Sequence, residues 1–463
     1  MSIRYLLAIC FIWMPYSDQS SFQNNTLPAS FLLPALQKIR LDNRITADSA
    51  YRELSNWNRY PSISSVGRQS LFSFYDSIFG EIPFRVFVPE SYKSTNRNPL
   101  LLLLHGAVGL SSFNDARNYL DPSSSAARDN AEDPLFNFFS KRGYIIVMPI
   151  ADSKKKFDWS INKFEGFAGV EPVTNNGVNA TYKTLSRMVS LVKASLNIDD
   201  DRVFAMGHSD GADGTFVLGL TQPSQFAAFA IYNSMLTNLA AHNIYLKNLK
   251  NISLYAVHSD LDDLRPIQGT REILTEANQF LDRKIIYKEY HGYRHFDKHL
   301  TIDVPYAAAF FEGIERDSYP ADIYWESENS ADNRCAWIAV DKFDVNMPKA
   351  DWQTEFNPKA YNKMSGDFGP GKCYDDNNES YAIRGHYSNN TFTIFTSRVK
   401  SFNIYIDPSR VNISLPVEIL VNGKRVFDGL VPPDKGFLLG NFGENFDRKA
   451  LWIAKVRINV PLA

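Results

Sequence analysis

Cysteine, long single-charge runs and long apolar runs are all scarce in this chain. Its 463 residues include three cysteines, at positions 10, 335 and 373, and its formal net charge is -2. Without a long basic run the chain lacks the electrostatic footprint of a nucleic-acid-binding protein. We also find no internal repeat and no low-complexity stretch, and the apolar run at residues 5–14 is too short to span a bilayer.

That short apolar run lies at the N-terminus, between Arg4 and Pro15. It matches the central region of a secretory signal peptide, and predicts a leader over residues 1–20 and a secreted or periplasmic protein. A buried N-terminal helix is the alternative, although such a helix normally shows a polar face and this run has none. Removal of the leader leaves Cys335 and Cys373, which form a disulfide or remain two separate buried thiols.

Strands and helices alternate over the larger part of the chain, which is too long for one typical domain. The runs 100–104 and 143–148 are apolar on both faces, as central parallel strands require. The pattern predicts a mostly parallel sheet with helices on both faces over residues 21–318. Strands are expected at 70–75, 83–89, 100–104, 143–148, 202–206, 226–231, 252–257 and 284–290, and helices within 36–57 and at 181–196, 210–220, 270–281 and 304–316.

The character of the sequence changes beyond Pro320. Residues 402–406 alternate apolar with mostly polar side chains, and Asn422-Gly423 between two short strand-like runs is a strong hairpin signal. Apolar residues from Trp452 to Val460 share one face of a last strand. Residues 319–463 are therefore predicted to form an all-β sandwich of short antiparallel strands.

A candidate nucleophile lies at the end of the apolar run 203–206. There the motif Gly207-x-Ser209-x-Gly211 is followed by a helical segment of small residues. A strand, a tight glycine-flanked turn and a helix are the elements on which an α/β-hydrolase mounts its serine. We therefore predict Ser209 as the nucleophile, which needs a histidine base and an orienting carboxylate in that chain order.

The segment from His258 to Pro266 carries the candidate acid. It resembles the His-Gly-x-x-Asp-x-x-x-Pro stretch of esterases of the polyhydroxybutyrate-depolymerase, dienelactone-hydrolase and prolyl-oligopeptidase-like groups. The resemblance implies an α/β-hydrolase fold and aligns Asp262 with the acid, while Ser259 replaces the family's glycine. The neighbours Asp260 and Asp263 belong to the same polar loop.

Three histidines follow the acid within the predicted hydrolase domain: His291, His295 and His299. The family has a glycine three residues before its catalytic histidine and often an aromatic residue after it. Gly292 and Phe296 supply these for His295, which we predict as the base, with His291 as the alternative. Arg294 is bulkier than the family's usual residue there.

The even spacing of these three histidines would suit a metal site on a helix. Gly292 and the preceding β-rich run argue against a helix, and no glutamate accompanies the histidines as in the zinc peptidases. We therefore expect no metal at these histidines, and a mechanism based on serine, histidine and aspartate implies no metal or organic cofactor.

The strand at 100–104 ends in His105-Gly106-Ala107, which resembles the His-Gly loop that supplies an oxyanion donor in many lipases and esterases. The resemblance implies that the backbone amides of Ala107 and Asp210 stabilise the developing negative charge. The whole pattern predicts an exported serine hydrolase that cleaves carboxylic esters, in small molecules or polymers, through an acyl-enzyme.

Two other functions remain open at this stage. A prolyl-oligopeptidase-like serine peptidase is one, although the chain lacks a propeller-sized N-terminal domain. A polymer-binding protein with an inactive hydrolase scaffold is the other. Aromatic residues of the sandwich could then form a stacking platform, although tryptophans more often pack in a core: Trp325, Trp337, Trp352 and Tyr374.

Overall fold

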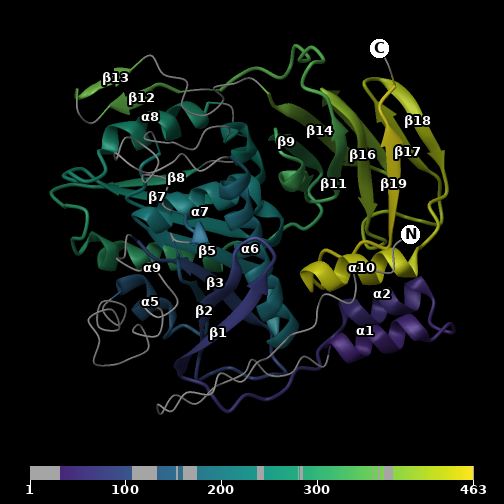
Figure 1. Ribbon diagram of the computed structural model, residues 1–463, viewed down its shortest axis with the longest axis horizontal. Coiled ribbons are helices and arrows are strands. Elements are labelled where there is room, and N and C mark those ends of the chain that lie inside the picture. The colour runs from purple at the N-terminus through teal and green to yellow at the C-terminus, as the bar shows by residue number, and fades with distance from the viewer. Residues whose placement is uncertain are drawn as a thin grey trace.

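The structure is a computed structural model that describes residues 32–106, 133–152, 155–159, 175–236, 244–279, 281, 285–356, 358–362, 365–369 and 379–461. The predicted leader, Ala107, Cys373 and Tyr374 lie outside the described residues. An α/β part and a β part lie side by side (Figure 1). None of the helices in the described ranges has both the length and the apolar character needed to cross a bilayer.

Eight strands form the large sheet, in the order β1-β2-β4-β3-β5-β6-β7-β8. Strands β1 and β2 form an antiparallel hairpin, β2 is antiparallel to β4, and the other neighbours are parallel. The predicted mostly parallel sheet is therefore confirmed. Its strands are β1 (Arg68–Asp76), β2 (Gly80–Val88), β3 (Asn98–Leu104), β4 (Ile145–Pro149), β5 (Ile198–His208), β6 (Ala228–Tyr232), β7 (Leu254–Ser259) and β8 (Ile286–Tyr290).

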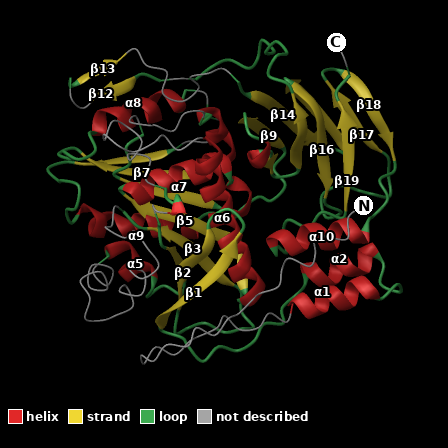
Figure 2. Ribbon diagram, viewed as in Figure 1, coloured by secondary structure: helices red, strands yellow, loops and turns green. Residues whose placement is uncertain are grey.

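Helices cover both faces of this sheet (Figure 2). Along β3, Leu100, Leu102 and Leu104 belong to one buried cluster, and Leu101 and Leu103 belong to another. The two clusters lie on opposite faces because successive side chains of a strand alternate in direction. The first includes residues of α6 (Asn175–Ser195), α7 (Asp210–Thr221) and α8 (Ile267–Ala277), and the second residues of α5 (Pro134–Phe139) and α9 (His299–Glu312).

The C-terminal part contains two sheets that share one core, as the sandwich prediction requires. One has the order β10-β11-β16-β19, and the other β18-β17-β15-β14-β9. The strands are β9 (Asp322–Ser327), β10 (Arg334–Cys335), β11 (Ile338–Phe343), β14 (Tyr381–Ser388), β15 (Thr391–Ser397), β16 (Val399–Ile406), β17 (Val417–Val421), β18 (Lys424–Gly429) and β19 (Ala454–Asn459). A separate short ribbon pairs β12 (Ala360–Asn362) with β13 (Asp367–Gly369).

Two features of this part differ from the prediction of an all-β, antiparallel sandwich. Strand β17 runs parallel to β15, because the chain passes through β16 of the opposite sheet before it returns. The segment Lys435–Asn445 is a helix, α10, with the Asp434 side chain accepting a hydrogen bond from the amide of Phe437 at its start. Leu438, Leu439 and Phe442 bury one side of this helix against the N-terminal helices α1 (Leu32–Leu41) and α2 (Ala47–Ser55).

Two of the tryptophans considered for a stacking platform, Trp325 and Trp337, pack instead in the sandwich core. Trp325 and Trp337 are 1% and 0% exposed, and their indole nitrogens donate to the carbonyls of Asp332 and Pro320. The platform hypothesis is therefore wrong for these two residues. Cys335 is a buried free cysteine in the same core.

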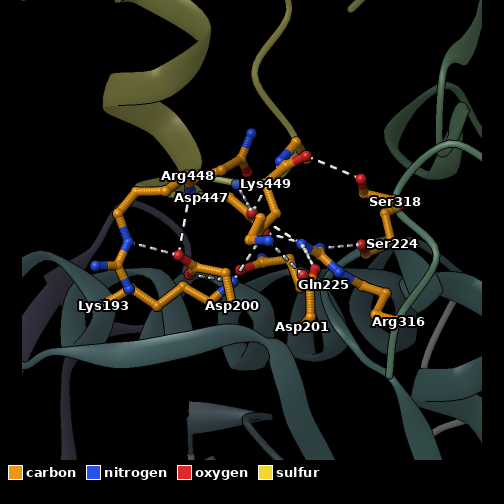
Figure 3. A network of polar contacts seen from close by, with 12 residues as sticks. Lys193, Asp200, Asp201, Ser224, Gln225, Arg316, Ser318, Asp447, Arg448 and Lys449 are labelled. Carbon is orange, nitrogen blue, oxygen red and sulfur yellow. Dashed lines mark hydrogen bonds and ion pairs between the residues drawn. The ribbon is translucent and has the colours of Figure 1, made fainter. Parts of the chain in front are cut away.

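A buried ionic cluster joins the end of α10 to the α/β part (Figure 3). Asp447 accepts hydrogen bonds from Lys193 of α6 and from Arg316, both at 2.8–2.9 Å. Arg448 donates to Asp200 on β5 at 2.7 Å. Each of these charges is buried and paired across the boundary between the two parts, as burial of charge requires.

Candidate active site

Ser209 occupies a tight turn between β5 and α7. Its backbone angles are φ 58° and ψ −125°, an unfavourable region for a residue with a side chain. A Cβ on Gly207 would collide with the backbone of Gly211, and one on Gly211 would collide with the carbonyl of Leu104. Both glycines of the motif are therefore required by close backbone contacts around Ser209.

The structure brings together the three side chains predicted for the site. Ser209 Oγ lies 2.8 Å from His295 Nε2, and His295 Nδ1 lies 2.7 Å from Asp262 Oδ2. They follow three different strands, β5, β7 and β8, whose carboxyl ends meet at one edge of the sheet. All three residues are buried, with 6% of Ser209, 2% of His295 and 5% of Asp262 exposed.

Asp262 is held from several directions. Its Oδ1 accepts hydrogen bonds from the amides of Leu264 and Arg265, at 3.0 and 2.8 Å. Burial by itself raises the pKa of Asp262, but the nearby His258 and the hydrogen bonds from His295 and Asn233 outweigh burial and hold that pKa well below its usual value. The carboxyl is therefore ionised and can orient a neighbouring imidazole by accepting its Nδ1 hydrogen.

The neighbouring acids of the loop have other partners. Asp260 accepts hydrogen bonds from His291 Nδ1 and from the amide of Gly292, at 3.0 and 2.7 Å. Asp263 is exposed and lies 3.4 Å from Arg294. Asp262 is therefore the acid of this loop that contacts His295.

The alternative histidines have different environments. His291, the alternative base, is largely exposed and pairs with Asp260. His299 is buried, and its Nε2 lies 2.9 Å from Asn233 Oδ1. No group of three or more potential metal ligands of the histidine, cysteine and carboxylate types occurs among the described residues.

His208, whose position beside the base the sequence analysis missed, precedes the serine in the motif. Its ring packs on His295 with 4.6 Å between centroids, and its Nε2 lies 2.9 Å from the His295 carbonyl oxygen. Burial is the main cause that lowers the pKa of His208 well below its usual value, and the nearby His295 lowers it further. The neutral ring therefore donates its Nε2 hydrogen to that carbonyl. Phe296, 73% exposed, packs edge-on against both rings.

Arg265 was also missed, because its role depends on residues distant in sequence. Its guanidinium forms buried ion pairs with Asp210 and Asp213 in the first turn of α7. Asp213 also accepts a hydrogen bond from Ser234 Oγ at 2.7 Å. Arg265 thus ties the loop of the acid to the helix that follows the nucleophile.

The predicted oxyanion donors are placed in part. Ala107 lies outside the described residues, but a Cβ on its neighbour Gly106 would lie 3.4 Å from Ser209 Cβ, so the end of β3 adjoins the serine. Asp210 is the first residue of α7, where backbone amides lack partners within the helix. His105 fixes the position of the chain at the end of β3, because its Nε2 accepts a hydrogen bond from the Ala151 amide at 3.1 Å. Burial lowers the pKa of His105 to about 4, so it is uncharged.

The sheet topology and the serine at the strand–helix turn define an α/β-hydrolase fold. Residues 76–299 match a family model named Esterase, described as “Putative esterase”. This match places residues 76–299 in an esterase family of the α/β-hydrolase superfamily, so this region is a serine hydrolase of the esterase type. The matched range includes Ser209, Asp262 and His295.

Several solved structures are similar to this chain over about half its length. A thermostable esterase is 21% identical, with 54% of this chain and 63% of that chain covered and a TM-score of 0.38. An S-formylglutathione hydrolase from Agrobacterium tumefaciens is 13% identical, with coverages of 54% and 96% and a TM-score of 0.38. A ferulic acid esterase from Anaeromyces mucronatus is 16% identical, with coverages of 55% and 93% and a TM-score of 0.36. The comparison with curated proteins gave no match.

Proposed function

We propose that this protein is an exported serine esterase that uses Ser209 as nucleophile, His295 as general base and Asp262 as the orienting acid. One observation carries the proposal: a continuous line of hydrogen-bond distances runs from Ser209 Oγ through both His295 nitrogens to Asp262. The esterase family match over residues 76–299 supports an ester as the bond that is cleaved.

The proposed reaction proceeds through an acyl-enzyme. His295 Nε2 takes the hydroxyl proton as Ser209 Oγ attacks the ester carbonyl, and Asp262 stabilises the imidazolium that forms. The amides of Asp210 and Ala107 donate to the oxyanion, and His295 then gives its proton to the leaving alcohol. Water, activated by the same imidazole, attacks the acyl carbon and restores Ser209. Every proton is carried by His295, so the mechanism needs no metal and no organic cofactor.

Labelling with a fluorophosphonate tests activation and site together. The native chain is expected to take up one label, on the peptide that contains Ser209, and Ser209→Ala is expected to take up none. Release of nitrophenol from nitrophenyl acetate, without cleavage of aminoacyl anilides, would favour the esterase. The reverse profile would favour the serine peptidase, and a folded chain that neither labels nor hydrolyses would support the binding protein.

Export is part of the proposal and rests on the apolar segment behind Arg4. Expression of the full chain in a host with a secretory pathway should release a shortened protein. N-terminal sequencing of that protein is expected to start near residues 17–21. A cytoplasmic product that begins at the original N-terminus would contradict export and leave the chemistry to be tested separately.

A further inference from the structure

Asn233 places a second hydrogen-bond donor on the carboxylate oxygen that faces His295. It follows β6, between the nucleophile strand and the acid strand, and its side chain is completely buried. Its Nδ2 lies 2.7 Å from Asp262 Oδ2 and 2.6 Å from Ser259 Oγ. That Oδ2 also lies 2.7 Å from His295 Nδ1. One oxygen therefore accepts from both the amide and the imidazole.

The chemistry of the partners fixes the direction of this amide. An ionised carboxylate only accepts hydrogen bonds, so the amide atom facing Asp262 is the NH₂ group and the Asn233 oxygen faces His299. His299 Nε2, 2.9 Å from that oxygen, must then carry a hydrogen. Burial is the main cause that lowers the pKa of His299 to about 4, so the ring is neutral. Its Nδ1 is buried without a hydrogen-bond partner among the described residues.

We propose that Asn233 and His299 are positioning residues of the active site, and this inference rests on the proposed function. His299 holds the Asn233 amide in one orientation, and the amide keeps Asp262 Oδ2 in line with the Nδ1 hydrogen of His295. The line of hydrogen bonds from Ser209 thus continues for two residues beyond the acid.

The other polar side chain close to Asp262 Oδ2, His258, has a nearer partner. His258 Nε2 lies 3.6 Å from Asp262 Oδ2, but only 2.8 Å from the carbonyl oxygen of Arg265, to which it donates. The His299 ring also contacts the rings of Tyr290 and Tyr293, at 6.0 and 5.8 Å between centroids, and the Tyr290 hydroxyl donates to Asp303. Removal of the Asn233 amide should therefore leave Asp262 Oδ2 with His295 as its single close donor.

The backbone at Asn233 limits which substitutions are informative. Its φ is 53°, in the left-handed region that asparagine, aspartate and glycine tolerate, and its amide donates to the Val257 carbonyl of β7 at 2.9 Å. Asn233→Gly and Asn233→Asp keep this backbone conformation. Asn233→Gly removes the amide donor, and Asn233→Asp replaces the amide with a carboxyl group.

Steady-state hydrolysis of a soluble aryl ester between pH 5 and 9 tests the inference. Asn233→Gly is expected to lower kcat about tenfold to a hundredfold, with KM within about twofold, because a hydrogen bond to a charged group is lost. Asn233→Asp should be most active where its new carboxyl is protonated and able to donate. Its activity should fall as pH rises and the two carboxylates repel, a fall that the native chain does not show.

Variants of His299 test the second step. His299→Gln keeps an N–H that can donate to the Asn233 oxygen, so it should retain most of kcat. His299→Phe removes that donor and should lower kcat with little change in KM. Equal losses in the two variants would show that His299 acts by packing alone and would overturn its positioning role.

Asn248 provides a matched control. It is also buried, with 2% exposed, and its Nδ2 donates to the carbonyls of Leu220 and Glu326 rather than to Asp262. Asn248→Gly should lower the melting temperature without changing the pH profile of the folded enzyme. If folded Asn233→Gly keeps the native kcat and pH profile while Ser209→Ala is inactive, the positioning role of Asn233 is overturned and the proposed function stands. A native chain that is inactive on esters and unlabelled at Ser209 would overturn the proposed function and the inference together.

Discussion

At the scale of single residues, the acid loop is connected to the nucleophile helix through one buried cation. Arg265 lies beside Asp262 in sequence and contacts Asp210 and Asp213 in space, so three charges share a site closed to solvent. A buried carboxylate that loses its partner retains the full cost of desolvation. The position of Asp262 therefore depends on a charge balance outside the three proposed catalytic residues.

We predict that Arg265→Met lowers the free energy of unfolding by about 3 kcal/mol or more, because two buried carboxylates lose their cation. Urea denaturation measures this change. Arg271→Met is the control, since Arg271 forms a partly exposed pair with Glu289 and should cost about 1 kcal/mol or less. Similar losses in the two variants would contradict the role assigned to Arg265.

Local signals in the sequence predicted which three side chains lie together, but they did not reveal residues whose contacts depend on tertiary structure. Ser209 lies in a glycine-flanked motif, and Asp262 and His295 follow strands in a recognisable order, so their meeting could be predicted. Arg265 and Asn233 gain their roles only when loops after β6 and β7 lie side by side. The sequence segments that contain Arg265 and Asn233 carry no pattern that predicts these contacts.

At the scale of elements, apolar patterning predicted the large sheet well and predicted α10 poorly. The central strands are short runs of apolar residues, a signal that survives without tertiary information. Helix α10 contains three glycines at positions 436, 440 and 443, which disfavour a helix. Burial of Leu438, Leu439 and Phe442 against other helices outweighs this weak propensity.

Leu438 lies on the buried side of α10. Leu438→Ala should lower the free energy of unfolding by about 2–5 kcal/mol, because the side chain is fully buried and its removal leaves a cavity. Thermal or chemical denaturation measures the loss. The exposed Leu430→Ala is the control and should change stability by about 0.5 kcal/mol or less. A change of that size in Leu438→Ala would contradict tertiary burial as the cause of this helix.

Asp332 of the 3₁₀ turn η5 (Ser330–Asp332) accepts a hydrogen bond from the side chain of Gln222 at the end of α7. Burial raises the pKa of Asp332 to about 7, although the hydrogen bond from Gln222 opposes the shift. The folded state therefore binds this proton more tightly than the unfolded state. Its contribution to stability is greatest at low pH and declines as pH rises from about 4 to about 7.

Asp332→Asn removes this titration and keeps an acceptor for Gln222. The stability of the variant relative to the native chain should therefore increase with pH across that window, by at most about 1.4 kcal/mol per pH unit. Urea denaturation at pH 4, 5.5 and 7 measures the difference. A constant difference between the two chains would contradict a raised pKa at Asp332.

At the scale of the whole molecule, the β part packs directly against the α/β part. Asp447 and Arg448 enter the α/β part and pair with Lys193, Asp200 and Arg316 (Figure 3). Helices α1 and α2 lie near the start of the described chain, and they pack against α10, which lies near the end of the chain. The two parts thus share buried charge and apolar surface.

Removal of the chain after Pro320 should therefore destabilise the α/β part, because buried cations at positions 193 and 316 lose Asp447. We expect a lower melting temperature and a poorly soluble product, measured by thermal unfolding against the full chain. Arg448→Met in the full chain should show part of the same loss without the deletion. A truncated chain as stable as the full protein would show that the two parts fold independently.

The proposed hydrolysis depends most on the activation of Ser209 by His295. The direct measurement is the rate of fluorophosphonate labelling, followed by mapping of the labelled peptide, in the native chain, Ser209→Ala and His295→Ala. We predict one label per native chain at Ser209, none in Ser209→Ala, and labelling slowed at least a hundredfold in His295→Ala. Equal labelling rates in native and His295→Ala chains, or a label on another residue, would contradict the central claim.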